Sequence, residues 1–102
     1  MLENIDTKIS LDDFITKVGV GVTLVVFSAP WCAPCRKMQA VVKGISATER
    51  VVEVNVDGNI PLCSHYNIFN VPTLMLLKDG AYQRSLSGYR NSQEVVAFIK
   101  GK

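Results

Sequence analysis

The chain places two cysteines, two residues apart, between a strand-like segment and a helix-like segment. Leu24–Phe27 is a continuous β-prone run, and the dithiol Cys32-Ala33-Pro34-Cys35 follows it closely. From Pro34 to about Glu49 the apolar residues recur with helical spacing. A thiol at a helix N-terminus is favoured as the thiolate, because the backbone N–H groups there carry partial positive charge. This order predicts a dithiol–disulfide redox centre.

The rest of the chain alternates helix-like and strand-like segments. Ser10 predicts a helix start, Gly19 and Gly21 end that helix, and Asn91 with Glu94 resembles a capping box. The order favours an α/β fold with a central mixed four- to five-stranded sheet and helices on both faces. An edge strand is expected before Ser10. The remaining expected elements are strands 51–56, 73–77 and 81–86, a short helix 61–66, a hairpin turn 78–80 and a final helix after Asn91.

Composition narrows the class of protein. The 102 residues fit one domain, 1–102, and 48% are hydrophobic. The formal net charge of +2 and the absence of long apolar runs argue against nucleic acid or a membrane as partner. The first six residues are polar and acidic and have no apolar core of a signal peptide. Three cysteines in such an apolar chain favour a reducing compartment, so we expect a cytoplasmic protein, unless an exported form has already lost its signal.

Several motifs in register resemble the thioredoxin family. They are the block Trp31–Cys35, the block Val71-Pro72-Thr73, the turn 78–80 and the pair Ser87-Gly88. The resemblance covers essentially the whole chain and is best from Leu24 onward. It implies a single thioredoxin-like domain with the thioredoxin fold. It also implies a protein-disulfide reductase that carries electrons by reversible dithiol–disulfide exchange.

The two cysteines take different expected roles. Cys32, partly exposed at the start of the helix, is the expected nucleophile, and Cys35, shielded one turn further, is the expected resolving thiol. The alternative is half of a zinc site, for which only Cys63 and His65 remain as further ligands. A second Cys-x-x-Cys pair is absent from the sequence, so we expect no metal. The redox-active Cys32–Cys35 disulfide would be the only redox group, with no bound cofactor.

The resemblance also implies a client-binding rim around the dithiol. Pro72 resembles the cis-proline of the family, and the backbone of Val71 would pair with an extended client segment. An ordinary trans-proline turn is the alternative for Pro72, and burial in the core is the alternative for Trp31. The expected rim, to which Tyr89 is a further candidate, comprises Trp31, Ala33, Pro34, Val71, Pro72 and Gly88.

The chain departs from the family pattern behind the resolving cysteine. The family usually has a buried aspartate on the second strand and often a partner lysine on the third, whereas here Val26 and Glu53 stand at those positions. Glu53 is therefore a candidate proton acceptor for Cys35, with the alternative that it bends out to solvent. Cys63 is expected to fill the core, and a regulatory thiol is the alternative.

Partners follow from the resemblance. It implies recharging by an NADPH-dependent thioredoxin reductase and a range of disulfide-containing client proteins. The chain has no glycine fingerprint for a nucleotide of its own, so it needs such a reductase, and we expect a monomer. In the family a histidine next to the second cysteine accompanies oxidants and isomerases, so the resemblance implies a reductant, because no histidine lies next to Cys35. Two other functions stay open: a thioredoxin-fold binding or scaffold module, and a thiol oxidant or isomerase of an exported compartment.

Overall fold

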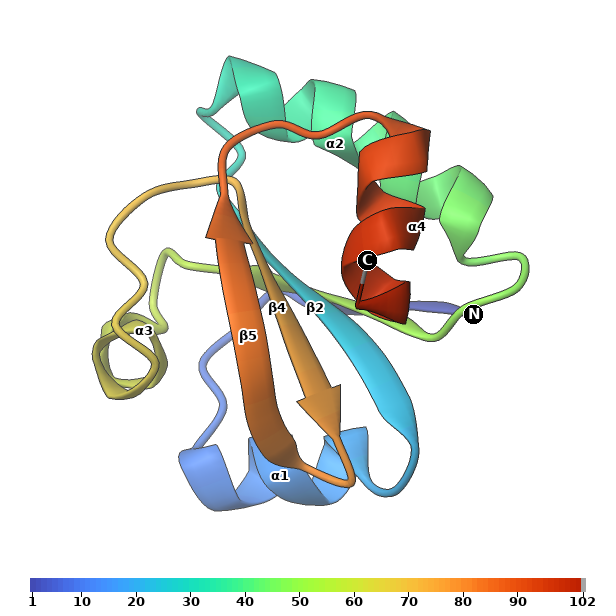
Figure 1. Cartoon of the computed structure of the whole chain (residues 1–102). Helices are drawn as coiled ribbons and strands as arrows, with labels where there is room; N and C mark the ends of the chain where they lie inside the picture. The colour runs from blue at the N-terminus through green and yellow to red at the C-terminus, as the bar shows by residue number, and fades with distance from the viewer. Residues whose placement is uncertain (102) are drawn as a thin grey trace.

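A five-stranded mixed sheet forms the centre of the molecule in the computed structural model, which describes residues 1–101 (Figure 1). The strand order is β1-β3-β2-β4-β5. The first three strands in this order run parallel to one another, and β4 and β5 are antiparallel to their neighbours. The predicted edge strand before Ser10 is confirmed as β1. The strands are β1 (Leu2–Ile5), β2 (Val22–Ser28), β3 (Val51–Asn55), β4 (Thr73–Lys78) and β5 (Ala81–Ser87).

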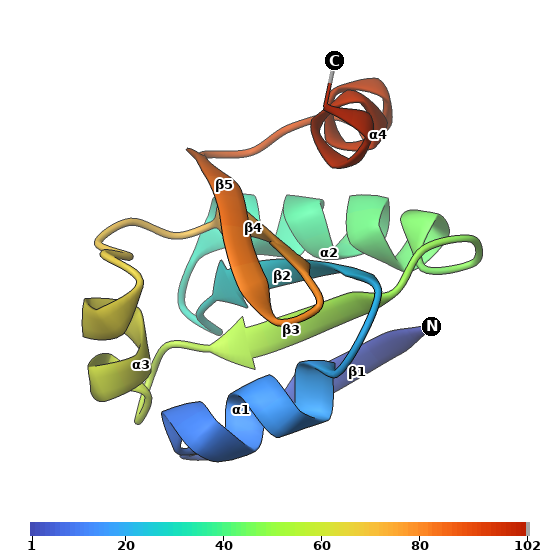
Figure 2. The ribbon, with the colours of Figure 1, turned by 60° about the horizontal axis from the view of Figure 1, so that its bottom comes forward.

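Helices cover both faces of the sheet. Figure 2 shows α2 and α4 on one side and α1 and α3 on the other. The expected α/β architecture with helices on both faces is therefore confirmed. The helices are α1 (Leu11–Val18), α2 (Ala33–Ile45), α3 (Ile60–His65) and α4 (Ser92–Lys100).

The sheet separates two apolar cores because β2 sends alternate side chains to opposite faces. Leu24 and Val26 pack beneath α2 and α4, together with Met38 and Phe98. On the other face, Val25 and Phe27 pack against α1 and α3; the buried residues of this second core include Phe14, Val18, Val52, Val54, Leu62, Cys63, Ile68, Met75 and Leu77. A strand buried on both faces reads as a continuous apolar run, as predicted from residues 24–27.

Local signals at the helix ends are confirmed for α1 and α4. The Ser10 hydroxyl accepts from the N–H of Asp13, and Asn91 and Glu94 form both bonds of a capping box. The expected C-terminal end of α2 was wrong, since the helix stops at Ile45 and not near Glu49. The N-terminal ammonium of the chain donates to the carbonyls of Ser46 and Glu49. The spacing of apolar residues cannot predict this contact, because it joins segments that lie far apart in the sequence.

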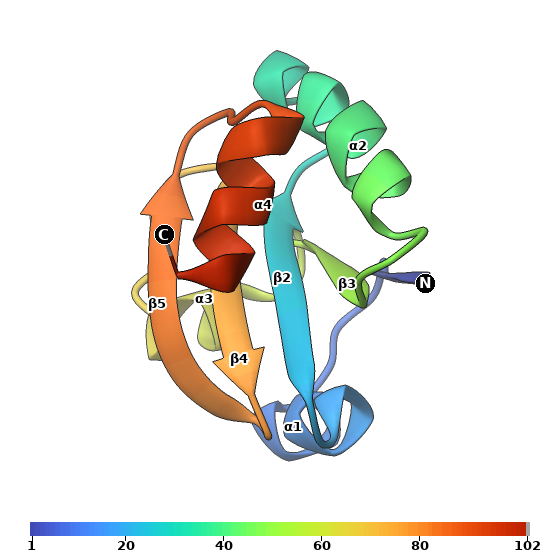
Figure 3. The same cartoon turned by 45° about the vertical axis from the view of Figure 1, so that its right-hand side comes forward.

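The sheet register brings the two redox motifs together. β2 and β4 are antiparallel, and Phe27 near the end of β2 pairs with Thr73 at the start of β4. The loop after β2 and the loop before β4 therefore meet at the same end of these two neighbouring strands. Figure 3 shows β2 running up to the N-terminal end of α2. Within residues 1–101, no helix has the length and apolar character needed to cross a membrane.

Candidate active site

Cys32 is the N-cap residue of α2, at the end of the short loop that connects β2 to this helix. Its backbone is extended (φ −97°, ψ 113°), and its sulfur accepts the backbone N–H of Cys35 at 3.3 Å. This bond and the N-terminal end of the helix both favour negative charge on Sγ. Pro34 lies in the first turn, where a missing N–H costs no helical hydrogen bond. The Cys32 sulfur thus lies where the helix presents its free backbone N–H groups.

Cys32 is more covered than the sequence suggested. Its residue exposure is 6%, against 1% for Cys35, and both pack with Ala29 in a small cluster that Val56 and Val71 border. The Cys32 thiol also donates to the carbonyl of Val71 at 3.7 Å. The expected partial exposure of Cys32 is therefore wrong in degree, because the loop before β4 lies over the sulfur.

Cys35 lies one helical turn deeper and is shielded, as predicted. Burial, the hydrogen bond with the Cys32 thiol and the negative charges of Cys32 and Glu53 raise the pKa of the Cys35 thiol to about 12. All three cysteines of the chain are free thiols in this structure. A thiol with this pKa needs a proton acceptor before it attacks another sulfur at neutral pH.

The peptide bond between Val71 and Pro72 is cis, which excludes the trans alternative. Gly88, with φ 91° in the left-handed region, donates its N–H to the Pro72 carbonyl at 2.8 Å. The hydroxyl of Thr73 donates to the Asn70 carbonyl at 2.6 Å. Side-chain and backbone bonds from β4 and from the end of β5 thus hold the loop that covers Cys32.

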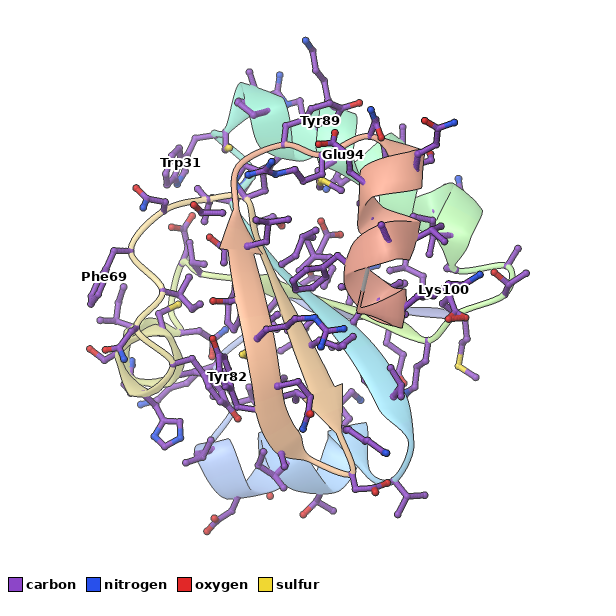
Figure 4. The ribbon with its side chains drawn as sticks, viewed as in Figure 1. Trp31, Phe69, Tyr82, Tyr89, Glu94 and Lys100 are labelled. Carbon is purple, nitrogen blue, oxygen red and sulfur yellow. The ribbon has the colours of Figure 1, made fainter. Side chains whose placement is uncertain are left out.

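Trp31 lies at the surface, so the alternative of core burial is wrong for this residue. Its exposed fraction is 67%, and its indole N–H donates to the Asp57 carboxylate at 3.3 Å. Ala33 and Pro34 are exposed beside it. Val71 and Gly88 are half-buried, and Tyr89 is exposed near the top of the view in Figure 4. Pro72 is buried, so its contribution to a binding surface comes from its backbone geometry.

Sequence reasoning missed two exposed apolar side chains near the dithiol. Ile60 at the start of α3 is 66% exposed and Phe69 in the loop after α3 is 79% exposed. Figure 4 shows Trp31 and Phe69 projecting on the same side of the molecule. A cavity of about 180 Å³ runs between them, lined by Trp31, Val56, Ile60, Cys63, Ile68, Phe69, Asn70 and Val71. The sequence carries no local signal for this exposure, because Ile60 precedes Pro61-Leu62 and Phe69 follows Ile68.

Glu53 points inward, so the alternative of a solvent-directed side chain is wrong. It lies on β3 beside Val26 of β2, its residue exposure is 8%, and its Oε2 accepts the Ser28 hydroxyl at 2.9 Å. The shared face is the one that α2 covers, because Val51 and Val26 both pack there. The structure therefore brings a carboxyl close enough to act on Cys35 electrostatically.

Cys63 and His65 do not join the dithiol. Cys63 is 6% exposed and packs in the core on the α1 and α3 face, and burial raises its pKa. His65 is exposed, with its ring against Tyr66. In the part of the chain that the structure describes, no three histidine, cysteine or acidic side chains gather into a possible metal site. The geometry therefore offers the dithiol no further ligands from these two residues.

Comparison with known proteins agrees with this geometry. The family described as Thioredoxin matches residues 5–101. Thioredoxin from Staphylococcus aureus is 30% identical over 96 residues, which cover 90% of this chain and 92% of the relative.

Solved structures agree over almost the full length. A mutant thioredoxin from Halobacterium salinarum NRC-1 superposes with a TM-score of 0.86 at 26% identity, covering 97% of this chain and 89% of the other. Reduced thioredoxin pre-protein from Schistosoma mansoni gives 0.83 at 26% identity, covering 97% of both chains. A chain from a structure on thiol resolution in yeast mitochondrial 1-Cys peroxiredoxin via the glutathione and thioredoxin systems gives 0.79 at 28%, covering 94% of both. The chain therefore belongs to the thioredoxin family of protein-disulfide oxidoreductases.

Proposed function

We propose that Cys32 and Cys35 carry the disulfide reduction of this thioredoxin-type enzyme, with Cys32 as nucleophile and Cys35 as resolving thiol. The observation that carries the proposal is the position of Cys32 as N-cap of α2 with its sulfur bonded to the N–H of Cys35. The lower exposure of Cys35 supports the division of roles, because an incoming disulfide reaches the outer sulfur first.

The cycle then needs two exchanges of sulfur partners. The Cys32 thiolate attacks one sulfur of the client disulfide, and the client's other sulfur leaves as a thiolate and takes a proton from water. Cys35 loses its proton and attacks the Cys32 sulfur of the mixed disulfide, which releases the second client thiolate. Two electrons pass to the client, and the protein is left with a Cys32–Cys35 disulfide.

Glu53 is our candidate for the group that takes the Cys35 proton. It is buried on the face that α2 covers, and its charge contributes to the raised pKa of the Cys35 thiol. A carboxylate at such a place is a suitable general base because it can accept the Cys35 proton inside the protein.

An exposed apolar rim is our candidate for the client-docking surface. It comprises Trp31, Ala33, Pro34, Val71, Pro72 and Gly88, to which we add Ile60 and Phe69. The half-buried backbone of Val71 lies beside Cys32, where an extended client segment would reach both the sulfur and the rim. Large exposed apolar side chains around one cavity favour protein partners, since isolated ones are normal but gathered ones mark interaction surfaces.

The source of electrons follows from the same chemistry. The enzyme passes electrons between redox partner proteins, and one structural neighbour comes from a study of peroxiredoxin resolution by the glutathione and thioredoxin systems. We place an NADPH-dependent thioredoxin reductase upstream and disulfide-containing clients, peroxiredoxins among them, downstream. We place the protein in the cytoplasm, because a reductant works in a reducing compartment. It would act as a monomer and use only its own cysteine pair, with no bound cofactor.

The test is reduction of insulin disulfides, first with dithiothreitol and then with NADPH and a bacterial thioredoxin reductase. We expect turnover in both assays, none with Cys32→Ser, and a trapped client mixed disulfide with Cys35→Ser. A scaffold module would trap no mixed disulfide and would not turn over. A reduction potential near that of thiol oxidants, measured against glutathione, would instead assign the protein to the oxidants.

A further inference from the structure

A buried polar pair lies behind the dithiol, where most of the surrounding core is apolar. Ser28 at the end of β2 is 5% exposed and donates its hydroxyl to Oε2 of Glu53 at 2.9 Å. The other carboxylate oxygen, Oε1, has no hydrogen-bond partner among residues 1–101. Burying a carboxyl is costly unless it is hydrogen-bonded, so the hydroxyl has a direct effect on which orientation Glu53 keeps.

The strand register explains why the two side chains meet. Glu53 of β3 pairs with Val26 of β2, and Ser28 lies two residues further along β2 on the same face. The face is the one that α2 covers with Cys35 and Met38. Figure 3 shows β3 lying beside β2 beneath α2. The Glu53 carboxyl therefore reaches Ser28 across the face that α2 covers.

A small polar cavity connects this pair with the surface. It has a volume of about 100 Å³, enough to hold water, and its lining is formed by Asp6, Ser28, Ala29, Pro30, Gln39, Glu53 and Asn55. Three of its polar residues, Asp6, Gln39 and Asn55, are only partly buried or exposed, as is Pro30. A proton taken up by Glu53 therefore has a short polar route to solvent.

We propose that Ser28 is the positioning residue of the resolving step. Its hydroxyl holds Oε2 of Glu53 so that Oε1 stays free to accept the proton of Cys35, directly or through a water, and the cavity returns that proton to solvent. This inference rests on the proposed function. In the step itself the Cys35 S–H bond breaks, the proton goes to the Glu53 carboxylate, and the Cys35 sulfur forms a bond with Cys32 as the Cys32–client bond breaks.

Two titratable groups face Glu53 from outside its own strand. Cys35 of α2 interacts electrostatically with Glu53, and Asp6, which follows β1, lines the same cavity, whereas Gln39 and Asn55 on the cavity wall are neutral. No salt bridge joins Glu53 to a cation within residues 1–101. The carboxylate is therefore oriented by a neutral hydroxyl, and removal of that hydroxyl changes orientation without removing a charge.

The test separates the two sulfur exchanges with stopped-flow kinetics. The reduced protein is mixed with excess dithiobis-nitrobenzoate, which releases one coloured thiolate when Cys32 attacks and a second when Cys35 resolves the mixed disulfide. The first phase depends on reagent concentration and the second does not. In Cys35→Ser only the first phase remains, which identifies the second as the resolving step.

We expect Glu53→Gln to slow the second phase about a hundredfold near neutral pH, the lower end of what a general base contributes. Ser28→Ala should slow it less, about tenfold, because the carboxylate is still present but mispositioned. The first phase should keep its rate in both variants. The deficits should shrink as the pH rises, because hydroxide then removes the Cys35 proton without Glu53. Ser28→Thr, which keeps a hydroxyl, should restore the second phase.

Two further variants make the result specific. Thr23→Val removes another buried hydroxyl from β2, one that has no hydrogen-bond partner in residues 1–101, and should leave both phases unchanged. The double variant Ser28→Ala/Glu53→Gln should be no slower than Glu53→Gln alone, because Ser28 acts only through Glu53. Additive losses, or an equal slowing of both phases in Ser28→Ala, would overturn the proposal.

Failure of this inference is distinct from failure of the proposed function. If Glu53→Gln and Ser28→Ala both resolve at the wild-type rate while insulin is still reduced, the relay is wrong and the reductase assignment stands. If the wild-type protein shows no second phase at all, the dithiol assignment itself is wrong. Far-UV circular dichroism of each variant, read together with its first phase, shows whether the fold is retained.

Discussion

Single contacts between distant residues determine how the dithiol is presented. Cys32 and Val71 are 39 positions apart in the chain, yet the thiol of one donates to the carbonyl of the other. Val71 borders the small cluster around the two cysteines, and its bond to Pro72 is cis. Cys32 is thereby covered from one side by the half-buried Val71.

Phe69 should contribute to client affinity and not to stability, because 79% of the residue is exposed. We expect Phe69→Ser to raise the KM for insulin about fivefold with kcat unchanged, since partial burial of an aromatic ring is worth about 1 kcal/mol. Steady-state assays with dithiothreitol would measure this. Tyr82→Ser is the control, an exposed aromatic on β5 that lies away from Trp31 in Figure 4. Equal effects of the two substitutions would argue against a docking role for Phe69.

At the scale of single elements, α4 shows how hydrogen bonds at the start of a helix stabilise it. Asn91 accepts the N–H of Glu94 at 2.9 Å, and the Glu94 carboxylate accepts the N–H of Asn91 at 3.1 Å. The helix in turn packs Val95 and Phe98 onto the sheet beside α2. Because a helix of nine residues has little stability of its own, the cap and this packing are both needed.

Loss of the cap should therefore destabilise the protein measurably. We expect Asn91→Ala to lower the free energy of unfolding by about 1 kcal/mol, since it leaves a backbone N–H without its partner. Urea unfolding followed by circular dichroism would test this. Gln93→Ala, an exposed substitution in the same turn, should change the unfolding midpoint little. A midpoint for Asn91→Ala equal to that of Gln93→Ala would exclude a contribution from the capping box.

At the scale of the whole molecule, buried thiol and phenol groups make the stability of the fold depend on pH in alkaline solution. Burial raises the pKa of Cys35 to about 12 and raises the pKa values of Cys63 and Tyr66. In the unfolded chain these groups return to the ordinary values of 9.0 for a thiol and 10.0 for a phenol. The folded state then binds more protons than the unfolded state above pH 9.0, so stability falls as the pH rises.

The reduced protein should therefore lose stability in alkaline solution while its stability near neutrality stays flat with respect to these three groups. Urea midpoints measured between about pH 7 and pH 11 should decline from about pH 9 upward. In Cys63→Ala, which removes one of the raised thiols, the decline should be shallower. A midpoint that holds constant up to the highest pH would contradict the linkage.

Much of the fold could be predicted because its signals are local. The alternation hidden in Leu24–Phe27, the caps at Ser10 and Asn91 and the apolar periodicity after Cys35 each act through neighbours within about one helical turn or one strand. The end of α2 was predicted wrongly: the helix stops at Ile45, and the N-terminal ammonium donates to the carbonyls of Ser46 and Glu49 beyond it. Local periodicity carries no information on such a contact.

The sequence by itself determined that a dithiol begins a helix after a buried strand, and hence the chemistry of the site. Only the tertiary structure decided that Glu53 turns inward to Ser28, that Trp31 lies outside the core, and that Phe69 shares its side of the molecule. The physical reason is one of range. Helix caps and strand alternation arise from adjacent residues, whereas side-chain orientation at the site depends on how β2, β3 and β4 pair across long stretches of chain.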